Sequence, residues 1–104
     1  MSIKFLNPKE VPNPIGNYSN VAVVPEDKKI LFLAGQIGND HTGIVSKKLE
    51  DQYGQALKNI NEIIKSQGGD KKNLVRITVF LTEKPSDRQL LKKQAEKYFN
   101  DPPP

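Results

Sequence analysis

The stretch KILFLAGQIG, residues 29–38, decides how this chain folds. Residues 30–33 are apolar without a break, whereas a strand with one wet face would alternate apolar and polar side chains. We therefore expect a strand that is covered on both faces. Gly35 then leaves bare backbone at the end of this strand, where a ligand or another chain can come close. The chain's own helices can cover one face, and we expect a neighbouring subunit to cover the other.

The segments before this stretch predict a hairpin and an arm. Tyr18–Val24 has β character, and the four residues Pro25–Lys28 form a turn that leads into residue 29. Pro12 and Pro14 exclude a helix further upstream, so an extended arm is expected there. Asn39–Gly43, on the other side of the central stretch, is predicted to be a loop.

A long amphipathic helix is predicted next. Ser46 is a suitable N-cap, and Gly68 and Gly69 are typical of a helix end. Between them, apolar or half-apolar residues recur at steps of three and four and form one stripe that faces the sheet: Leu49, Tyr53, Ala56, Leu57, Ile60, Ile63 and Ile64.

A second strand and a second helix complete the predicted elements. Leu74–Thr82 alternates apolar and mixed side chains, and a strand–helix–strand order implies a parallel pair with a right-handed crossover. Pro85 and Ser86 are predicted to open the second helix, with Gln89 completing a capping box, and Asn100–Pro104 to stop it. The expected fold class is α/β (α+β), a mixed sheet with two helices packed on one face.

Composition narrows the function classes. With 104 residues, 36% hydrophobic and 27% charged, the chain is one globular domain and neither disordered nor membrane-embedded. Its net charge of +4 comes with scattered lysine pairs and no interleaved aromatics, which does not favour a nucleic-acid partner. The sequence has no cysteine and one histidine, His41, so we expect no metal and no cofactor. Residues 1–10 lack a signal core, so we expect a cytoplasmic protein, with a mitochondrial location left open.

Four segments carry a family resemblance: Ile15–Asn20, Leu33–Ile37, Val79–Thr82, and Tyr98-Phe99 before the proline run at 102–104. In order and spacing they resemble the RidA family, also called YjgF or endoribonuclease L-PSP. The resemblance implies a single domain over residues 1–104 with a chorismate-mutase-like fold, in a homotrimer with clefts between subunits. It also implies hydrolysis of 2-imino acids to 2-keto acids and ammonia, without a metal or cofactor.

The resemblance also assigns site residues. Tyr18 matches a tyrosine that lines the cleft, and Gly35 matches the glycine whose backbone approaches the ligand. Ala34 stands where active deaminases usually have serine, and Lys92 stands where many members have asparagine. The substrate-binding residues expected from the resemblance are therefore Tyr18, Ala34, Gly35 and Lys92. The family's carboxylate-binding arginine and its glutamate follow the proline run in a C-terminal strand region, which we expect to be absent from residues 1–104.

Three functions stay open at this point. The chain is a 2-iminobutanoate/2-iminopropanoate deaminase, a non-catalytic small-molecule-binding or interaction member, or an RNA-binding, endoribonuclease-type translation inhibitor. Whether it is an enzyme is left open, and if it is one we expect a hydrolase. Arg76 on the second predicted strand could replace the missing arginine only if it pointed into the cleft, because a carboxylate needs a planar two-pronged cation.

Overall fold

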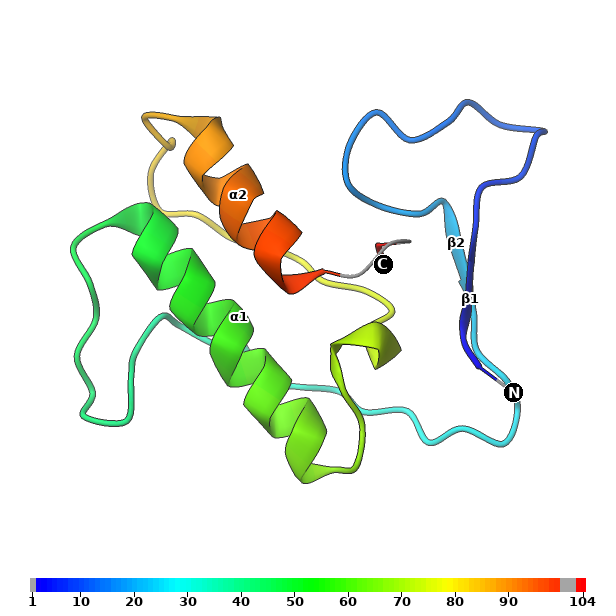
Figure 1. The fold of residues 1–104 in the computed structure, drawn as a ribbon, viewed down its shortest axis with the longest axis horizontal. Helices are drawn as coiled ribbons and strands as arrows, with labels where there is room; N and C mark the ends of the chain where they lie inside the picture. The colour runs from blue at the N-terminus through cyan, green and yellow to red at the C-terminus, as the bar shows by residue number, and fades with distance from the viewer. Residues whose placement is uncertain (1, 100–102) are drawn as a thin grey trace.

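A computed structural model describes residues 2–99 and 103–104 of this chain. The described elements are strands β1 (Lys4–Leu6) and β2 (Val21–Val23), helix α1 (Leu49–Ser66), a single 3₁₀ turn η1 (Lys71–Asn73) and helix α2 (Arg88–Tyr98). The molecule is flat, with extents of 41 × 32 × 20 Å. Helices α1 and α2 lie side by side, and the β1–β2 pair stands apart from them (Figure 1). The chain thus combines two helices with a small antiparallel sheet, as an α+β protein does.

The described sheet is a pair of short antiparallel strands. Lys4 lies opposite Val23 and Leu6 opposite Val21. The side chain of Asn7 accepts a hydrogen bond from the backbone N–H of Asn20 at 2.9 Å, which closes one end of the pair. The predicted hairpin between residues 18–24 and the central stretch is therefore wrong, because β2 pairs with the N-terminal segment. The turn itself is confirmed, since Lys28 N donates to the carbonyl of Pro25 at 3.2 Å.

The central stretch is held by helix α1 instead of by β2. The side-chain amide of Asn59 donates to the backbone carbonyls of Ile37 at 3.2 Å and Asn39 at 2.9 Å. These bonds fix the end of the stretch against the helix, and the segment runs past α1 (Figure 1). Within residues 2–99 no ladder includes residues 29–37, so the strand predicted there is wrong as a hydrogen-bonded element. The loop predicted at Asn39–Gly43 is confirmed.

The segment Leu74–Thr82 is also without a ladder partner among the described residues, so the predicted parallel pair is not formed. Val75 and Ile77 are nevertheless half-buried, whereas Arg76 and Thr78 between them are exposed. The alternation predicted the inward face correctly as far as Ile77, whereas Val79 and Leu81, predicted on the same face, are 46% and 41% exposed. A strand also needs a neighbouring backbone at hydrogen-bond distance, and side-chain periodicity cannot supply one.

Helix α1 carries the core. Leu57 is 2% exposed and Ile64 is 5% exposed, and both belong to the predicted stripe. The predicted N-cap is wrong: the helix begins at Leu49 after Lys48, which makes no side-chain capping bond. Ser46 instead holds the preceding turn, because its Oγ accepts from Lys48 N at 3.2 Å. The predicted glycine end is confirmed, with Gly68 at a φ of 86°.

Helix α2 packs along α1. Asp87 caps it by accepting a hydrogen bond from the backbone N–H of Gln89 at 2.9 Å, so the cap is one residue later than the predicted Ser86. Both residue types make good caps, and the sequence alone does not choose between neighbours. The helix ends at Tyr98, and the predicted stop residues Asn100, Asp101 and Pro102 lie outside the described part of the chain.

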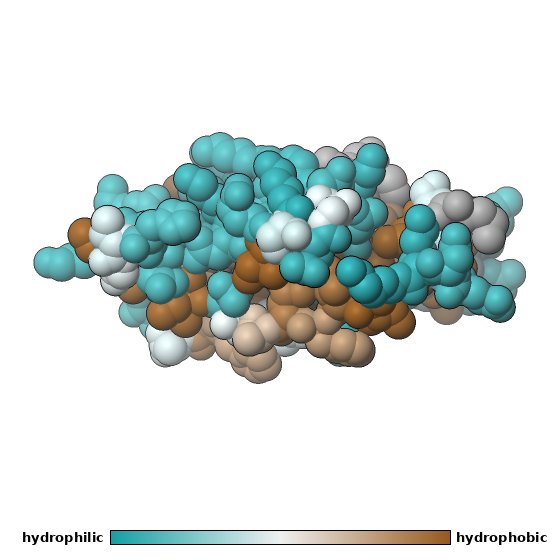
Figure 2. Space-filling model, turned by 90° about the horizontal axis from the view of Figure 1, so that it is seen from below, coloured by the Kyte–Doolittle hydropathy of each residue, from teal (hydrophilic) through white to brown (hydrophobic). Residues whose placement is uncertain are grey.

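The extended segments expose large apolar side chains. Phe32 is 94% exposed, Phe80 is 90% exposed and Ile30 is 65% exposed. Figure 2 shows hydrophilic residues along one side of the molecule and hydrophobic residues along the other. Among the described helices, none has the length and apolar character required to cross a lipid bilayer.

Candidate functional site

A hollow of about 520 Å³ opens where the segment before β2 meets both helices and the extended segment 74–82. Its volume lies in the range of small-molecule pockets, about 300–1,000 Å³. Its polar and aromatic lining comes from four parts of the chain that are distant in sequence: Asn17, Tyr18, Ser19, Asn20, Tyr53, Arg76 and Phe99. Only one of the predicted binding residues, Tyr18, is among them.

Tyr18 is positioned by a turn and by the proline run. Its backbone N–H donates to the carbonyl of Gly16 at 3.1 Å, which bends the chain just before β2. The next residue, Ser19, donates from its backbone N–H to the oxygen of Pro104 at 3.1 Å and from its Oγ to the carbonyl of Pro103. The tyrosine side chain remains 45% exposed. Its hydroxyl is therefore accessible to a small molecule in the hollow.

Among residues 2–99 and 103–104, Arg76 is the only residue with a charged side chain in the lining of this hollow. It lies between Val75 and Ile77, whose half-buried side chains fix the segment, and it is itself exposed. A guanidinium in this position attracts anions and can bind a carboxylate with two parallel N–H groups. The hollow therefore suits a small molecule that carries a carboxylate.

The helices supply an aromatic wall that sequence reasoning missed. Tyr53, on α1, and Ala95 and Phe99, at the C-terminal end of α2, line the hollow. Burial raises the pKa of the Tyr53 hydroxyl, which is therefore protonated at neutral pH and can donate a hydrogen bond. The periodicity placed Tyr53 correctly on the inward stripe, but inward residues are usually core. Only the position of the hollow shows that Tyr53 lines a site and is not simply a core residue.

The other predicted binding residues do not line the hollow. Ala34 and Gly35 are exposed on the central stretch, and a Cβ atom at Gly35 would meet no heavy atom within 4 Å. Lys92 is exposed on α2. Within the described chain, these three residues and Tyr18 are therefore not brought together in one site.

His41 lies in an exposed loop that Asp40 organises. The Asp40 carboxylate accepts hydrogen bonds from the Thr42 hydroxyl at 2.6 Å and from the backbone N–H groups of Thr42 and Ile44. These bonds, the Thr42 hydroxyl first, lower the pKa of Asp40 below its usual value. They account for the loop without a catalytic role. Across residues 2–99 and 103–104, no three metal-ligating side chains gather in one place.

Comparison with known proteins places the chain among named relatives. The sequence model of the family described as Endoribonuclease L-PSP matches residues 8–104. A RutC family protein of Aquifex aeolicus (strain VF5) is 32% identical over 93 residues, which is 88% of this chain and 71% of that protein. The 2-iminobutanoate/2-iminopropanoate deaminase of Homo sapiens is 34% identical over 82 residues, or 77% of this chain and 58% of the human protein.

The relatives are longer than this chain. Reactive Intermediate Deaminase A, chloroplastic, of Arabidopsis thaliana is 33% identical over 103 residues, which is 97% of this chain and 53% of that protein. The chain spans a little more than half the length of the human and Arabidopsis relatives it matches.

Proposed function

Because this chain belongs to the Endoribonuclease L-PSP family, we propose that it hydrolyses 2-imino acids such as 2-iminobutanoate and 2-iminopropanoate. The family resemblance expected from the sequence is confirmed by the match over residues 8–104. Relatives at 33–34% identity that are named as deaminases of these compounds support the proposed activity. The observation that carries the proposal is that Tyr18 and Arg76 line one hollow of suitable size.

Arg76 is proposed to bind the substrate carboxylate. A 2-imino acid carries its carboxylate next to the reactive C=N group, so a guanidinium that holds the carboxylate also fixes the imine carbon. Among residues 2–99 and 103–104, no acidic side chain lines the hollow to compete for Arg76.

The hydroxyls of Tyr18 and Tyr53 are proposed to position water. Water adds to the imine carbon, the C=N electron pair moves to nitrogen, and a proton follows to the nitrogen. The resulting carbinolamine then breaks its C–N bond, releasing ammonia and leaving the 2-keto acid. A protonated Tyr53 can donate a hydrogen bond to the imine nitrogen or to this water. The hydroxyl of Tyr18, on the solvent-exposed side of the hollow, can hydrogen-bond to the same water.

We further propose that copies of the chain assemble as a homotrimer with a chorismate-mutase-like fold. Exposed side chains such as Phe32 and Phe80 would otherwise leave a large apolar patch in water. Neighbouring copies that cover this patch would bring the central stretch of one subunit beside the hollow of another. Ala34 and Gly35 could then reach the ligand across the seam.

A non-catalytic binding role is the second candidate, and one observation favours it. Ala34 has no hydroxyl at the position where the resemblance implies serine, so the site has one group fewer to hold a water. The same hollow would then bind 2-keto acids without turnover. An RNA-directed role ranks last, because Arg76 is the only charged residue that the described part of the chain brings to the hollow, and repeated phosphate contacts require more.

The test is an imine-decay assay. An amino-acid oxidase generates the 2-imino acid in situ, and ammonia release is followed with this protein, with Arg76→Gln and with Arg88→Gln. We expect faster release than in buffer, loss of the acceleration in Arg76→Gln, and retention in Arg88→Gln, whose side chain does not line the hollow. No acceleration by the wild-type protein would overturn the hydrolase proposal, and 2-ketobutyrate binding that depends on Arg76 would then establish the binding role.

A further inference from the structure

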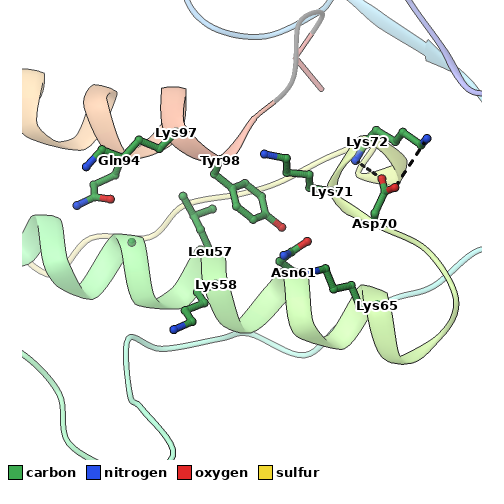
Figure 3. Close-up of a pocket in the computed structure, with 11 residues that line it drawn as sticks. Leu57, Lys58, Asn61, Lys65, Asp70, Lys71, Lys72, Gln94, Lys97 and Tyr98 are labelled. Atoms are coloured by element: carbon green, nitrogen blue, oxygen red, sulfur yellow. Dashed lines mark hydrogen bonds and ion pairs between the residues drawn. The ribbon is translucent and has the colours of Figure 1, made fainter.

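A second hollow lies in the groove between α1 and α2, next to the η1 turn (Figure 3). Its volume is about 520 Å³, and it shares no lining residue with the Tyr18–Arg76 hollow. Helix α2 separates the two, because Gln94, Lys97 and Tyr98 line this hollow whereas Ala95 and Phe99 line the other. Any ligand here would therefore be independent of the proposed 2-imino acid site.

Positive charge dominates the lining of this groove. Five lysines line it: Lys58, Lys65, Lys71, Lys72 and Lys97. Asp70 is the only acidic residue in the lining among residues 2–99 and 103–104, and it already pairs with Lys72 at 3.8 Å. Within residues 2–99 and 103–104, no ion pair forms with the other four. Figure 3 shows Lys65 extending toward Asn61 and Lys71 extending toward Tyr98.

Two buried polar atoms give the groove a polar floor. Asn61 Oδ1 and the Tyr98 hydroxyl are both inaccessible to solvent, and neither has a hydrogen-bond partner among the described residues. Figure 3 shows the hydroxyl pointing toward Asn61. Buried polar atoms are nearly always paired, so two unpaired ones in the same hollow indicate a place for an external polar group. The amide of Asn61 can present either its oxygen or its NH₂ group to that partner.

We propose that this groove binds a small anion that carries two or more phosphate or carboxylate groups. The ammonium groups of Lys65 and Lys71 donate to its oxygens from the rim. Binding shifts the side chains that cover the Tyr98 hydroxyl and Asn61 Oδ1, so that the hydroxyl donates to the ligand and the amide of Asn61 supplies a further hydrogen bond. A single anionic group would leave part of this positive charge unpaired, so a ligand with at least two groups fits better.

The groove favours a small ligand over a nucleic acid. Tyr98 is the only aromatic residue that the described part of the chain contributes to its lining. The ring of Phe99 packs edge-on against Tyr98 at a centroid distance of 5.2 Å, and Lys71 Nζ lies 6.0 Å from the centroid of the Tyr98 ring. The tyrosine is therefore engaged by its neighbours, and the groove offers no second ring on which successive bases could stack.

The test titrates the full chain with inorganic pyrophosphate, with citrate and with neutral glucose in physiological salt, followed by calorimetry. Three variants are compared with the wild type: Lys65→Gln with Lys71→Gln, Tyr98→Phe, and the control pair Lys28→Gln with Lys47→Gln. The control pair removes the same charge from positions that do not line the groove. Side-chain amide NMR signals of Asn61 report binding at the floor.

We expect the Lys65/Lys71 pair to weaken binding of pyrophosphate or citrate by about tenfold or more, and the control pair by less than about twofold. Tyr98→Phe should weaken binding and leave the fold intact, and the Asn61 signals should shift in the wild type. The ligand is a phosphate compound if pyrophosphate binds more tightly than citrate, and a carboxylate compound if citrate binds more tightly. Equal losses in the two lysine pairs, or no anion binding, would overturn the proposal. Tighter binding of a short single-stranded RNA that also depends on Lys65 and Lys71 would replace the small anion with a nucleic acid.

Discussion

Gly38 packs directly against the backbone of Gln52 in helix α1, so closely that a Cβ atom at position 38 would lie 2.5 Å from the Cα of Gln52. The glycine is buried, and it ends the apolar stretch on which the sequence interpretation was centred. Asn59, two turns further along the same helix, bonds to the carbonyls on either side of it. The absence of a side chain at Gly38 is therefore what lets the central stretch reach the helix.

Replacing Gly38 by alanine should destabilise the fold by about 2 kcal/mol or more, because the new methyl group would meet backbone atoms that cannot move aside. Gly35→Ala is the matched control, since its methyl group would enter open space and should change stability by less than about 0.5 kcal/mol. Urea unfolding of both variants measures the difference. Equal stabilities would contradict the close approach.

The start of α2 offers a second comparison between neighbours. Asp87→Ala removes the carboxylate that accepts the hydrogen bond from Gln89 N, and it should cost about 1 kcal/mol of stability. Ser86→Ala should cost much less, because the structure gives the Ser86 side chain no capping bond. Thermal unfolding followed by circular dichroism measures both variants. A larger loss of stability in Ser86→Ala than in Asp87→Ala would show that Ser86 caps the helix, as the sequence predicted.

The helices were predicted well because their signals are local. A stripe at steps of three and four residues identified Leu57 and Ile64 as core, and the glycine pair located the end of α1. Helix α1 begins two residues beyond the predicted cap Ser46, after Lys48, and has no side-chain cap. The cap of α2 was misplaced by one residue because two good capping residues, Ser86 and Asp87, stand next to each other. Such a choice depends on backbone angles that side-chain type does not determine.

The strands and the site could not be predicted in this way. Whether an apolar segment joins a ladder depends on which backbone lies beside it, and β2 took the N-terminal segment as its partner instead of residues 29–38. The hollow is likewise a product of long-range contacts between Tyr18, Arg76 and the helices. A family resemblance named Tyr18, but only the folded chain placed Arg76 and Tyr53 beside it.

The exposed apolar side chains of the extended segments should hold copies of the chain together. Phe32→Asn with Phe80→Asn should dissociate the proposed trimer into monomers, because each ring loses the apolar contact that covers it in the assembly. Ile15→Asn is the control, since this residue is 99% exposed but lies in the N-terminal arm. Sedimentation velocity gives the masses. A wild-type monomer, or equal dissociation by the control, would contradict the proposed assembly.

The Tyr98 and Tyr53 hydroxyls should lose their protons at a higher pH than an exposed tyrosine does. Burial raises the pKa of Tyr98 from 10.0 to about 12, and it also raises that of Tyr53. Well below pH 10 both the folded and the unfolded chain keep these two protons, so the ionisation of Tyr53 and Tyr98 does not affect stability there. Between about pH 10 and 12 the unfolded chain loses the Tyr98 proton while the folded chain keeps it, so stability falls as pH rises.

Ultraviolet titration of tyrosinate should therefore show its last step near pH 12, and Tyr98→Phe should remove that step. The same variant should flatten the decline of the unfolding free energy with pH in this range, relative to Tyr18→Phe. If the titration step near pH 12 remained in Tyr98→Phe, the Tyr98 hydroxyl would not be the group that titrates last.

Substituting Arg76 by lysine separates charge from geometry in the proposed 2-imino acid site. Lysine keeps the positive charge but cannot present two parallel N–H groups to a carboxylate, so kcat/KM for 2-imino acid hydrolysis should fall by about tenfold, less than in Arg76→Gln. Arg88→Lys, at the start of α2 and away from the hollow, should behave as wild type. Saturation curves should place the loss mainly in KM if the guanidinium only binds, and in kcat as well if it also orients the imine carbon. Full activity in Arg76→Lys would show that the carboxylate is bound as a point charge or elsewhere.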